Sequence, residues 1–259
     1  MRERLAALRA RIDAAATAAG RRPETVELLA VSKGHPASAI REAFALGLDR
    51  FGESYAGEAL PKTAELRGAG AQWVYLGPVQ SNKTRLLAEN FSWVLGLCSL
   101  KAARRLDAQR PDDLPPLQVC VQVNADGDPA KAGLAPDELD PFLESVRDLK
   151  RLTVRGLMTI PRKAVPAAPV TGPPAFEVLA ELFAKQIAAG HRWDTLSMGM
   201  SGDFEAAIAA GSTQVRLGTA LFGPRPAKPG TGTESATGTG TGTETDTGTG
   251  TPGVDAHHD

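Results

Sequence analysis

Short strand-like runs alternate with helix-like stretches along most of the chain. The runs have the length typical of strands, and most are rich in aliphatic residues. They cover residues 26–32, 49–54, 73–77, 93–98, 117–124, 154–158, 195–200 and 213–218. Between them, apolar positions at helical spacing cover residues 37–47, 80–90, 136–149, 175–190 and 202–211. Several of these stretches begin near Ser, Asp or Pro and end on Gly, as helix caps require.

Strands that alternate with helices predict a parallel sheet with right-handed crossovers. Eight such strands predict an α/β fold, a single (β/α)8 TIM-type barrel, and a doubly wound open sheet is the alternative. Residues 1–20 predict an additional N-terminal helix, because Leu5, Leu8 and Ile12 share one helical face and Gly20 follows as a stop signal.

The composition changes sharply near residue 227. Gly and Thr alternate through residues 227–259, with almost no apolar side chain. Such a segment cannot offset its ordering entropy by burial. We therefore expect a barrel domain over residues 1–226 and a disordered Gly/Thr-rich tail over 227–259. Residues 162–175 form a Pro-rich insert, which predicts a loop after the sixth strand.

Composition and charge narrow the functional classes. The chain has 259 residues and a formal net charge of −1, which argues against a nucleic-acid partner. No apolar run has the length of a membrane span, and the first residues lack the apolar core of a secretory signal. We therefore expect a cytoplasmic protein with no membrane association. Cys98 and Cys120 are expected to be buried thiols, and neither they nor the histidines have the spacing of a metal site.

Candidate chemistry lies where the strands end. In a barrel these ends face the active site, and phosphate is often bound by the loops after strands seven and eight. Lys33 follows the first strand in "LLAVSKGHP". The last two strands continue into "SMGMSGD", in which Ser201 precedes a predicted helix, and "VRLGTALFG", which contains Arg216, Gly218 and Thr219.

Each of these residues also has a simpler interpretation. Lys33 could be a solvated strand end, Ser201 a helix N-cap, Gly218 a turn and Arg216 part of a surface ion pair. Their joint placement favours an amine that faces a phosphate cradle, as needed for a phosphorylated aldehyde such as pyridoxal 5'-phosphate. An arginine beside the pyridine nitrogen would keep that ring neutral and make it a weaker electron sink. We interpret Lys131, in "DPAKAGL", as an exposed loop lysine.

The chain also resembles a known family through a series of motifs. In order along the sequence they are "LLAVSK", "FGESY", "LGPVQSNK", "QVN", "RGLMTIP", "LSMGMSGDFEAAI" and "VRLGTALFG". These motifs resemble those of the pyridoxal phosphate homeostasis proteins, the YggS/PROSC group, which are relatives of the alanine racemase N-terminal domain. The resemblance covers roughly residues 5 to 225.

This resemblance implies a barrel that holds pyridoxal 5'-phosphate as a Schiff base on Lys33. It further implies that Ser197, Gly218 and Thr219 bind the phosphate, that Arg216 faces the pyridine nitrogen, and that Met198 and Ser201 line the same rim. Members of the family are regarded as non-catalytic carriers or regulators of the cofactor. The resemblance therefore implies a role in intracellular cofactor homeostasis, with PLP-dependent apoenzymes as recipients, and we expect a monomer.

The chain departs from the family pattern near the expected mouth of the barrel. Ser54 replaces an Asn, Val74 and Pro78 replace two histidines, Cys98 replaces an Asp, and Gly34 replaces a Thr. Each change leaves a smaller or less polar group, so contacts with the cofactor are expected to differ.

Two other functions remain as alternatives. The first is a PLP-dependent amino-acid racemase on the same barrel, which would need a second domain and a tyrosine base. The only tyrosines are Tyr55 and Tyr75, both near the early strands, and only the Gly/Thr tail follows the barrel. The second alternative is a barrel that binds another phosphorylated metabolite and uses Lys33 only for its charge.

Overall fold

The computed structural model describes residues 1–66, 68, 70–162 and 175–225. The Gly/Thr tail and nearly all of the Pro-rich insert lie outside the described residues. Parallel strands pair in sequence order, and the last pairs with the first, which closes the barrel. The prediction of a (β/α)8 barrel is therefore confirmed, and the open-sheet alternative is wrong.

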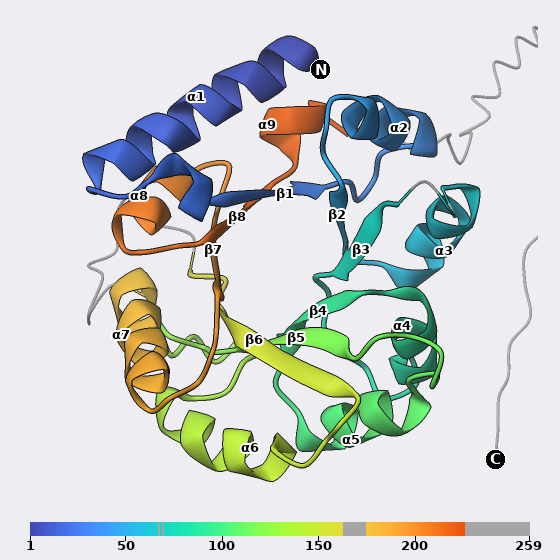
Figure 1. Ribbon diagram of the computed structural model, residues 1–259, viewed down its shortest axis with the longest axis vertical. Helices are drawn as coiled ribbons and strands as arrows, with labels where there is room; N and C mark the ends of the chain where they lie inside the picture. Colours follow the sequence, from blue (N-terminus) through green and yellow to red (C-terminus); the bar gives the residue numbers. More distant parts are fainter. Residues whose placement is uncertain (67, 69, 163–174, 226–259) are drawn as a thin grey trace, which may run out of the picture. The chain divides into compact units, whose positions relative to one another are not determined.

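The strands form the inner ring and the helices surround it (Figure 1). The strands are β1 (Glu27–Val31), β2 (Arg50–Glu53), β3 (Gln72–Tyr75), β4 (Trp93–Leu97), β5 (Leu117–Gln122), β6 (Leu152–Met158), β7 (Thr195–Met200) and β8 (Gln214–Leu217). The α-helices are α1 (Arg2–Ala18), α2 (Ala37–Ala45), α3 (Ala56–Glu65), α4 (Thr84–Asn90), α5 (Leu100–Gln109), α6 (Leu139–Val146), α7 (Ala175–Ala188), α8 (Phe204–Ala209) and α9 (Thr219–Phe222), and the 3-10 helices are η1 (Pro23–Thr25) and η2 (Pro136–Glu138).

The N-terminal helix α1 lies along the outside of the ring, beside α8 and α9 (Figure 1). Its buried residues include Leu5, Leu8 and Ile12, which confirms the apolar face predicted from the sequence. Arg4 secures the helix by donating to the backbone carbonyl of Leu221 at 2.8 Å. The additional helix therefore covers the side of the barrel where the first and last strands meet.

The alternation of residues along each strand separates two apolar clusters. The smaller cluster fills the inside of the barrel, and its buried members are Leu29, Val74, Trp93, Leu95, Cys120 and Met158. The larger cluster lies between the strands and the helices, and it includes Ala30, Phe51, Val94 and Val215. A side chain on a strand therefore points either into the barrel or toward a helix, according to its place in the two-residue period.

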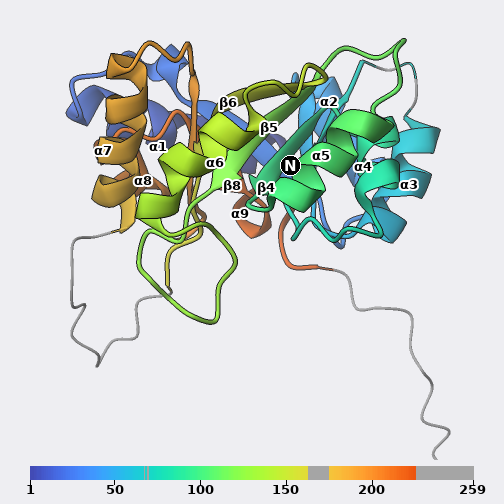
Figure 2. The same ribbon diagram turned by 90° about the horizontal axis from the view of Figure 1, so that it is seen from below.

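Two of the longer helices, α3 and α5, were not predicted from the sequence. Helix α3 contains Pro61, which interrupts a helical pattern, and α5 is rich in charged residues, with only Ala102, Ala103 and Leu106 buried. Both are nevertheless helical because their few buried residues pack on the barrel, for example Ala59 on α3 and Leu106 on α5. Figure 2 shows these helices flanking the strands, and it shows the segment between β5 and α6 extending beyond the strand ends.

Candidate functional site

Lys33 lies two residues beyond the last residue of β1, at the C-terminal end of the barrel. Its side chain is half-buried, and its amine donates to the hydroxyl of Ser54 at 3.3 Å. Burial lowers the pKa of Lys33, and the positive charges of Arg225 and Arg216 lower it further. A lowered pKa increases the fraction of neutral amine, which is the nucleophilic form. Lys33 is therefore more than a solvated strand end.

The closure of the barrel brings β8 beside β1. Leu29 pairs with Arg216 and Ala30 with Leu217, so Gly218 lies next to the end of β1. A Cβ atom on Gly218 would lie 3.1 Å from the carbonyl oxygen of Val31, which is closer than most real Cβ contacts. Glycine at this position therefore leaves room for the close approach of the two strand ends. Thr219 is exposed at the start of α9, on the same side of the barrel as Lys33.

Arg216 is buried, with 5% of its surface exposed. It donates to the Ser197 carbonyl at 2.7 Å, to the Ser197 hydroxyl at 3.0 Å and to the Thr159 carbonyl at 2.8 Å. These acceptors are neutral, and burial lowers the pKa of Arg216 to about 10. The simpler interpretation, a surface ion pair, is therefore wrong. The guanidinium is held deep in the barrel with two of its five N–H donors not used by these contacts.

Ser197 and Met198 are neighbours on β7 that point in opposite directions. Ser197 is fully buried and points toward Arg216, and its hydroxyl accepts a hydrogen bond from the guanidinium. Met198 is also fully buried, but it belongs to the apolar cluster between the strands and the helices. The Met198 side chain therefore does not lie at the rim, where we expected it. The two-residue period of the strand is the physical reason.

The turn after β7 contains Ser201 and Asp203. Asp203, rather than Ser201, occupies the N-cap position of α8, and its carboxylate accepts a hydrogen bond from the Met200 amide at 2.6 Å. Ser201 is half-buried, and none of the hydrogen bonds found among the described residues uses its hydroxyl. The interpretation of Ser201 as a plain N-cap is therefore wrong, and its hydroxyl lies at the same end of the barrel as Thr219.

The departures from the family pattern occupy different environments. Ser54 contacts Lys33 directly, while Val74 packs inside the barrel with Leu29 and Trp93. Pro78 is exposed, and its carbonyl accepts from the Tyr75 hydroxyl at 3.3 Å. Gly34 has φ +78°, and the Arg225 side chain packs over its Cα. The polar groups lost at these positions are therefore replaced by packing contacts and by one hydroxyl.

The two cysteines differ from each other. Cys120 is fully buried inside the barrel, where burial raises the pKa of its thiol well above the ordinary range. This confirms the prediction for Cys120. Cys98 follows the end of β4 and is only half-buried, so the prediction of a second buried thiol is wrong. Burial still raises the pKa of Cys98, and a backbone hydrogen bond from Gly133 partly opposes that shift.

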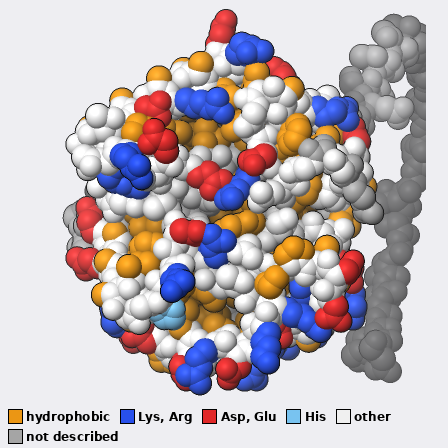
Figure 3. Space-filling view, in the orientation of Figure 1, with side chains coloured by type: hydrophobic (Ala, Val, Ile, Leu, Met, Phe, Trp, Pro, Cys, Tyr) orange, Lys and Arg blue, Asp and Glu red, His pale blue; other side chains and the backbone are white. Residues whose placement is uncertain are grey.

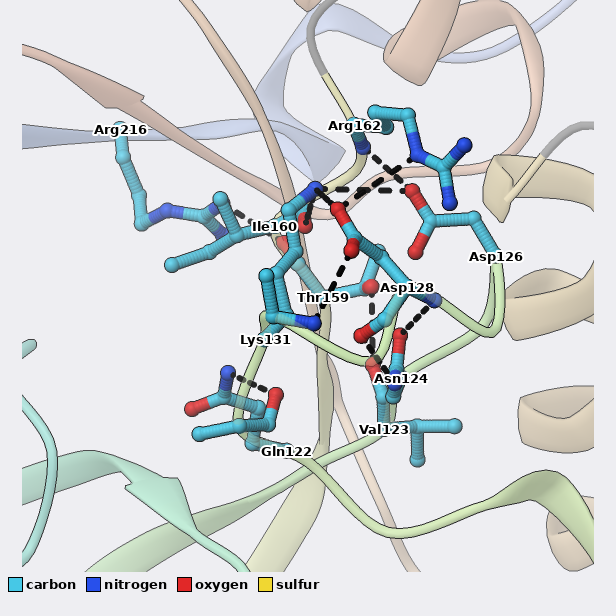
Figure 4. Close-up of polar contacts among 12 residues, drawn as sticks. Gln122, Val123, Asn124, Asp126, Asp128, Lys131, Thr159, Ile160, Arg162 and Arg216 are labelled. Carbon is cyan, nitrogen blue, oxygen red and sulfur yellow. Dashed lines mark hydrogen bonds and ion pairs between the residues drawn. The ribbon is translucent and has the colours of Figure 1, made fainter.

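Lys131 is not a free loop lysine, and that prediction is wrong. Its amine donates to the Ile160 carbonyl at 3.0 Å and forms ion pairs with Asp126 at 3.5 Å and Asp128 at 3.8 Å (Figure 4). Arg162 joins the same group through Asp128, at 3.5 Å. These contacts tie the segment after β5 to the segment after β6, next to the carbonyl of Thr159 that accepts from Arg216.

Two charged residues at this end of the barrel, Arg225 and Glu53, were not predicted from the sequence. Arg225 follows α9, and its charge reaches Lys33, but no motif pointed to it. Glu53 is fully buried at the end of β2, where it pairs with Lys62 of α3 at 2.8 Å. A carboxylate inside the strand-like run at residues 49–54 was a signal that could have identified this pair, because buried carboxylates need a partner.

Three further features of the described residues concern membrane spans, metal sites and the distribution of surface charge. None of the helices described is both long and apolar enough to cross a membrane. No group of three or more His, Cys, Asp or Glu among those residues is arranged to hold a metal ion. On the face of the molecule seen in Figure 3, basic and acidic side chains are interspersed.

The sequence of this chain is similar to a known family and to several known proteins. Residues 4–226 match the family model described as alanine racemase, N-terminal domain. The pyridoxal phosphate homeostasis protein of Pseudomonas aeruginosa is 52% identical over 223 residues, which covers 86% of this chain and 95% of that protein. The protein of the same name from Escherichia coli K12 is 47% identical over 227 residues, covering 85% and 95%.

Solved structures agree with these relatives. PipY of Synechococcus elongatus, solved with PLP bound, is 38% identical, with a TM-score of 0.72 over 85% of this chain and 99% of that one. Alanine racemase from Corynebacterium glutamicum is 17% identical, with a TM-score of 0.59, and this chain covers 63% of it. That similarity supports the fold alone. By sequence and by structure, this chain belongs to the alanine racemase N-terminal domain family and, within it, to the pyridoxal phosphate homeostasis proteins.

Proposed function

We propose that this chain binds pyridoxal 5'-phosphate and acts in intracellular PLP homeostasis, with Lys33 joined to the cofactor's aldehyde as a Schiff base. The observation that carries the proposal is the half-buried Lys33 amine with a lowered pKa, beside the end of β8 that presents Gly218 and Thr219. When bound, the cofactor supplies an aldehyde that condenses with an amine and releases water.

The residues at the mouth of the barrel are suited to the parts of this cofactor. Ser201 and Thr219 offer hydroxyl groups, and Gly218 allows the backbone to come close, which suits a phosphate. Arg216 lies deeper and keeps unused N–H donors, which suits the pyridine nitrogen. The sequence led us to expect Ser197 as a phosphate ligand, but its buried hydroxyl accepts from Arg216, so we propose that Ser197 orients Arg216 instead. We assign Met198 no side-chain contact, because that side chain packs toward the helices.

We further propose that the chain is not a catalyst. An arginine beside the pyridine nitrogen leaves that nitrogen unprotonated, so the ring is a weaker electron sink for carbanion chemistry. Neither tyrosine offers a base in the barrel of the described chain. Tyr55 is 65% exposed, and the Tyr75 hydroxyl is engaged with the Pro78 carbonyl. Burial raises the pKa of Tyr75, so less of its basic form, the phenolate, is present at neutral pH.

Three finer parts of the role are also proposals. They are a cytoplasmic location, a monomeric state and PLP-dependent apoenzymes as recipients of the cofactor. The relatives' name, which refers to homeostasis of pyridoxal phosphate, supports a role in supply rather than in turnover. A transfer assay with an apoenzyme and sedimentation of the purified chain test the last two parts directly.

The test of cofactor binding is a visible absorption titration with pyridoxal phosphate. We expect a new band in the wild-type protein, which borohydride abolishes, and no such band in Lys33→Ala. Lys101→Ala is the matched control, because Lys101 is exposed at the start of α5 and should leave the band unchanged. A wild-type protein without the band, at cofactor concentrations well above micromolar, would contradict the proposal. Turnover of an amino acid in a racemase assay would contradict the non-catalytic role.

A further inference from the structure

Lys62 is a buried lysine close to the half-buried Lys33. It lies on α3 with 7% of its surface exposed. Its ammonium group donates to the Ser32 carbonyl at 3.2 Å, to Glu53 at 2.8 Å and to Glu58 at 2.6 Å. An ammonium group carries three donors, so these contacts use its full capacity. Lys62 therefore ties α3 to the segment that follows β1 through fully used hydrogen bonds.

Lys62, Glu53 and Glu58 form a charged cluster, and this cluster holds the residues on both sides of Lys33. Ser32 donates its hydroxyl to Glu53 at 2.6 Å, and its carbonyl accepts from Lys62. Gly34 donates its amide to Glu58 at 2.5 Å. The two carboxylates meet at the Lys62 amine, so a single side chain links the contacts that flank Lys33.

The cluster is costly to maintain. Glu53 is fully buried, and burial raises its pKa despite the hydrogen bonds from Lys62 and Ser32. Its second carboxylate oxygen has no hydrogen-bond partner among the described residues. Burial also opposes ionisation of Glu58, but the bonds from Lys62 and from the Gly34 amide hold the pKa of Glu58 below its ordinary value. Apolar side chains of similar volume would often be as stable as such a group.

We propose that Lys62, acting through Glu58 and Glu53, is a positioning residue that fixes the backbone on both sides of Lys33 and so aims the Lys33 amine at the cofactor. This inference rests on the proposed function. Lys33 has a long, flexible side chain, and its only hydrogen bond found in the described chain is to Ser54. Fixing its backbone limits the positions that its amine can reach, which is the geometric requirement for reaction with a bound aldehyde.

Charge alone could also couple the cluster to Lys33. Arg225 and Arg216 lower the pKa of Lys33, while Glu53 and Glu58 raise it. Glu58→Ala and Glu58→Gln both remove the negative charge of Glu58, so both must lower this pKa. If charge alone mattered, the two variants would bind the cofactor alike. Loss of positioning, in contrast, weakens binding in Glu58→Ala and spares it in Glu58→Gln, which separates the two roles.

The experiment compares Lys62→Met, Glu58→Ala and Glu58→Gln with the wild type. Cofactor affinity comes from the absorption titration, and the pKa of Lys33 in the cofactor-free protein comes from reductive methylation with formaldehyde, followed at the Lys33 peptide across pH. We expect about tenfold weaker cofactor binding in Lys62→Met and Glu58→Ala, as for loss of a charge-assisted hydrogen bond. We expect the methylation midpoint to fall in Glu58→Ala and in Glu58→Gln, because both variants lose the negative charge that raises the pKa of Lys33. Glu58→Gln keeps an acceptor for the Gly34 amide and should recover most of the affinity.

Lys185→Met is the matched control, because Lys185 forms an exposed ion pair with Asp140 at 2.7 Å on α7 and α6. Lys62→Met leaves two carboxylates without their partner and could fail to fold. Glu58→Ala keeps the test decisive, because Glu58 is one-third exposed and alanine favours a helix. The proposal is overturned if Glu58→Gln binds as weakly as Glu58→Ala, or if Glu58→Ala binds as tightly as the wild type. A wild-type protein that does not bind the cofactor contradicts the proposed function instead.

Discussion

Arg216 and Ser197 form a buried pair across β8 and β7, in which one guanidinium nitrogen donates to both the carbonyl and the hydroxyl of the same serine. A buried cation without a carboxylate is unusual, because burial favours its neutral form. The neutral acceptors of Ser197 and Thr159 hold the guanidinium in one place. It is thus oriented before any ligand arrives.

Removing the Ser197 hydroxyl tests this pair. We expect Ser197→Ala to lower the free energy of unfolding by about 1.5–3 kcal/mol, because a buried hydrogen bond to a charged group is lost. Urea denaturation measures the change. Ser145→Ala is the control, since Ser145 is exposed and its hydroxyl donates to the Pro141 carbonyl of its own helix. Equal stabilities for the two variants would show that the hydroxyl does not hold Arg216.

Lys33 should make stability depend on pH. Burial and the charges of Arg225 and Arg216 lower its folded-state pKa below the ordinary 10.5, so between these values the unfolded chain binds more protons. Stability due to this group therefore rises with pH across that window, and below it Lys33 is destabilising. We expect Lys33→Met to be more stable than the wild type at pH 7, by up to about 1 kcal/mol given solvent screening.

The difference between Lys33→Met and the wild type should shrink as the pH approaches 10.5. Urea denaturation of both proteins at several pH values measures it. Lys150→Met, at an exposed lysine before β6, is the control for the loss of a lysine side chain. A constant difference across the pH range would mean that protonation of Lys33 is not its cause.

Gly34 should be difficult to replace. Its φ of +78° is unfavourable for other residues, and an added Cβ would lie 2.8 Å from the Arg225 side chain. We expect Gly34→Ala to cost about 1–2 kcal/mol of stability and to displace Arg225, which thermal unfolding and a crystal structure would reveal.

Gly57→Ala provides the comparison for this substitution. Gly57 lies in α3, has no atom within 4 Å of an added Cβ, and should gain up to about 1 kcal/mol because alanine favours a helix. If both variants were equally stable, the positive φ of Gly34 would carry no measurable cost.

Local sequence patterns predicted the elements better than the directions of side chains. The run at residues 195–200 predicted strand β7, but it could not show that Ser197 points into the barrel while Met198 points toward the helices. Adjacent residues on a strand always face opposite sides, and only packing determines which side is which. Likewise, "DPAKAGL" contains only one of the carboxylates that pair with Lys131. The other is Asp126, and the Ile160 carbonyl comes from a distant part of the chain.

The sequence by itself determined the alternation of strands and helices, the place of Lys33 at a strand end and the glycine and hydroxyl groups after the last strands. These features depend on residues close together in the chain, where hydrophobic period and caps act locally. Tertiary structure decided that the barrel closes, so that Gly218 lies beside Val31 and the charge of Arg216 reaches Lys33. It also decided that Lys62 links Ser32 and Glu58. Contacts between distant residues depend on the packing of the whole domain, which no local pattern specifies.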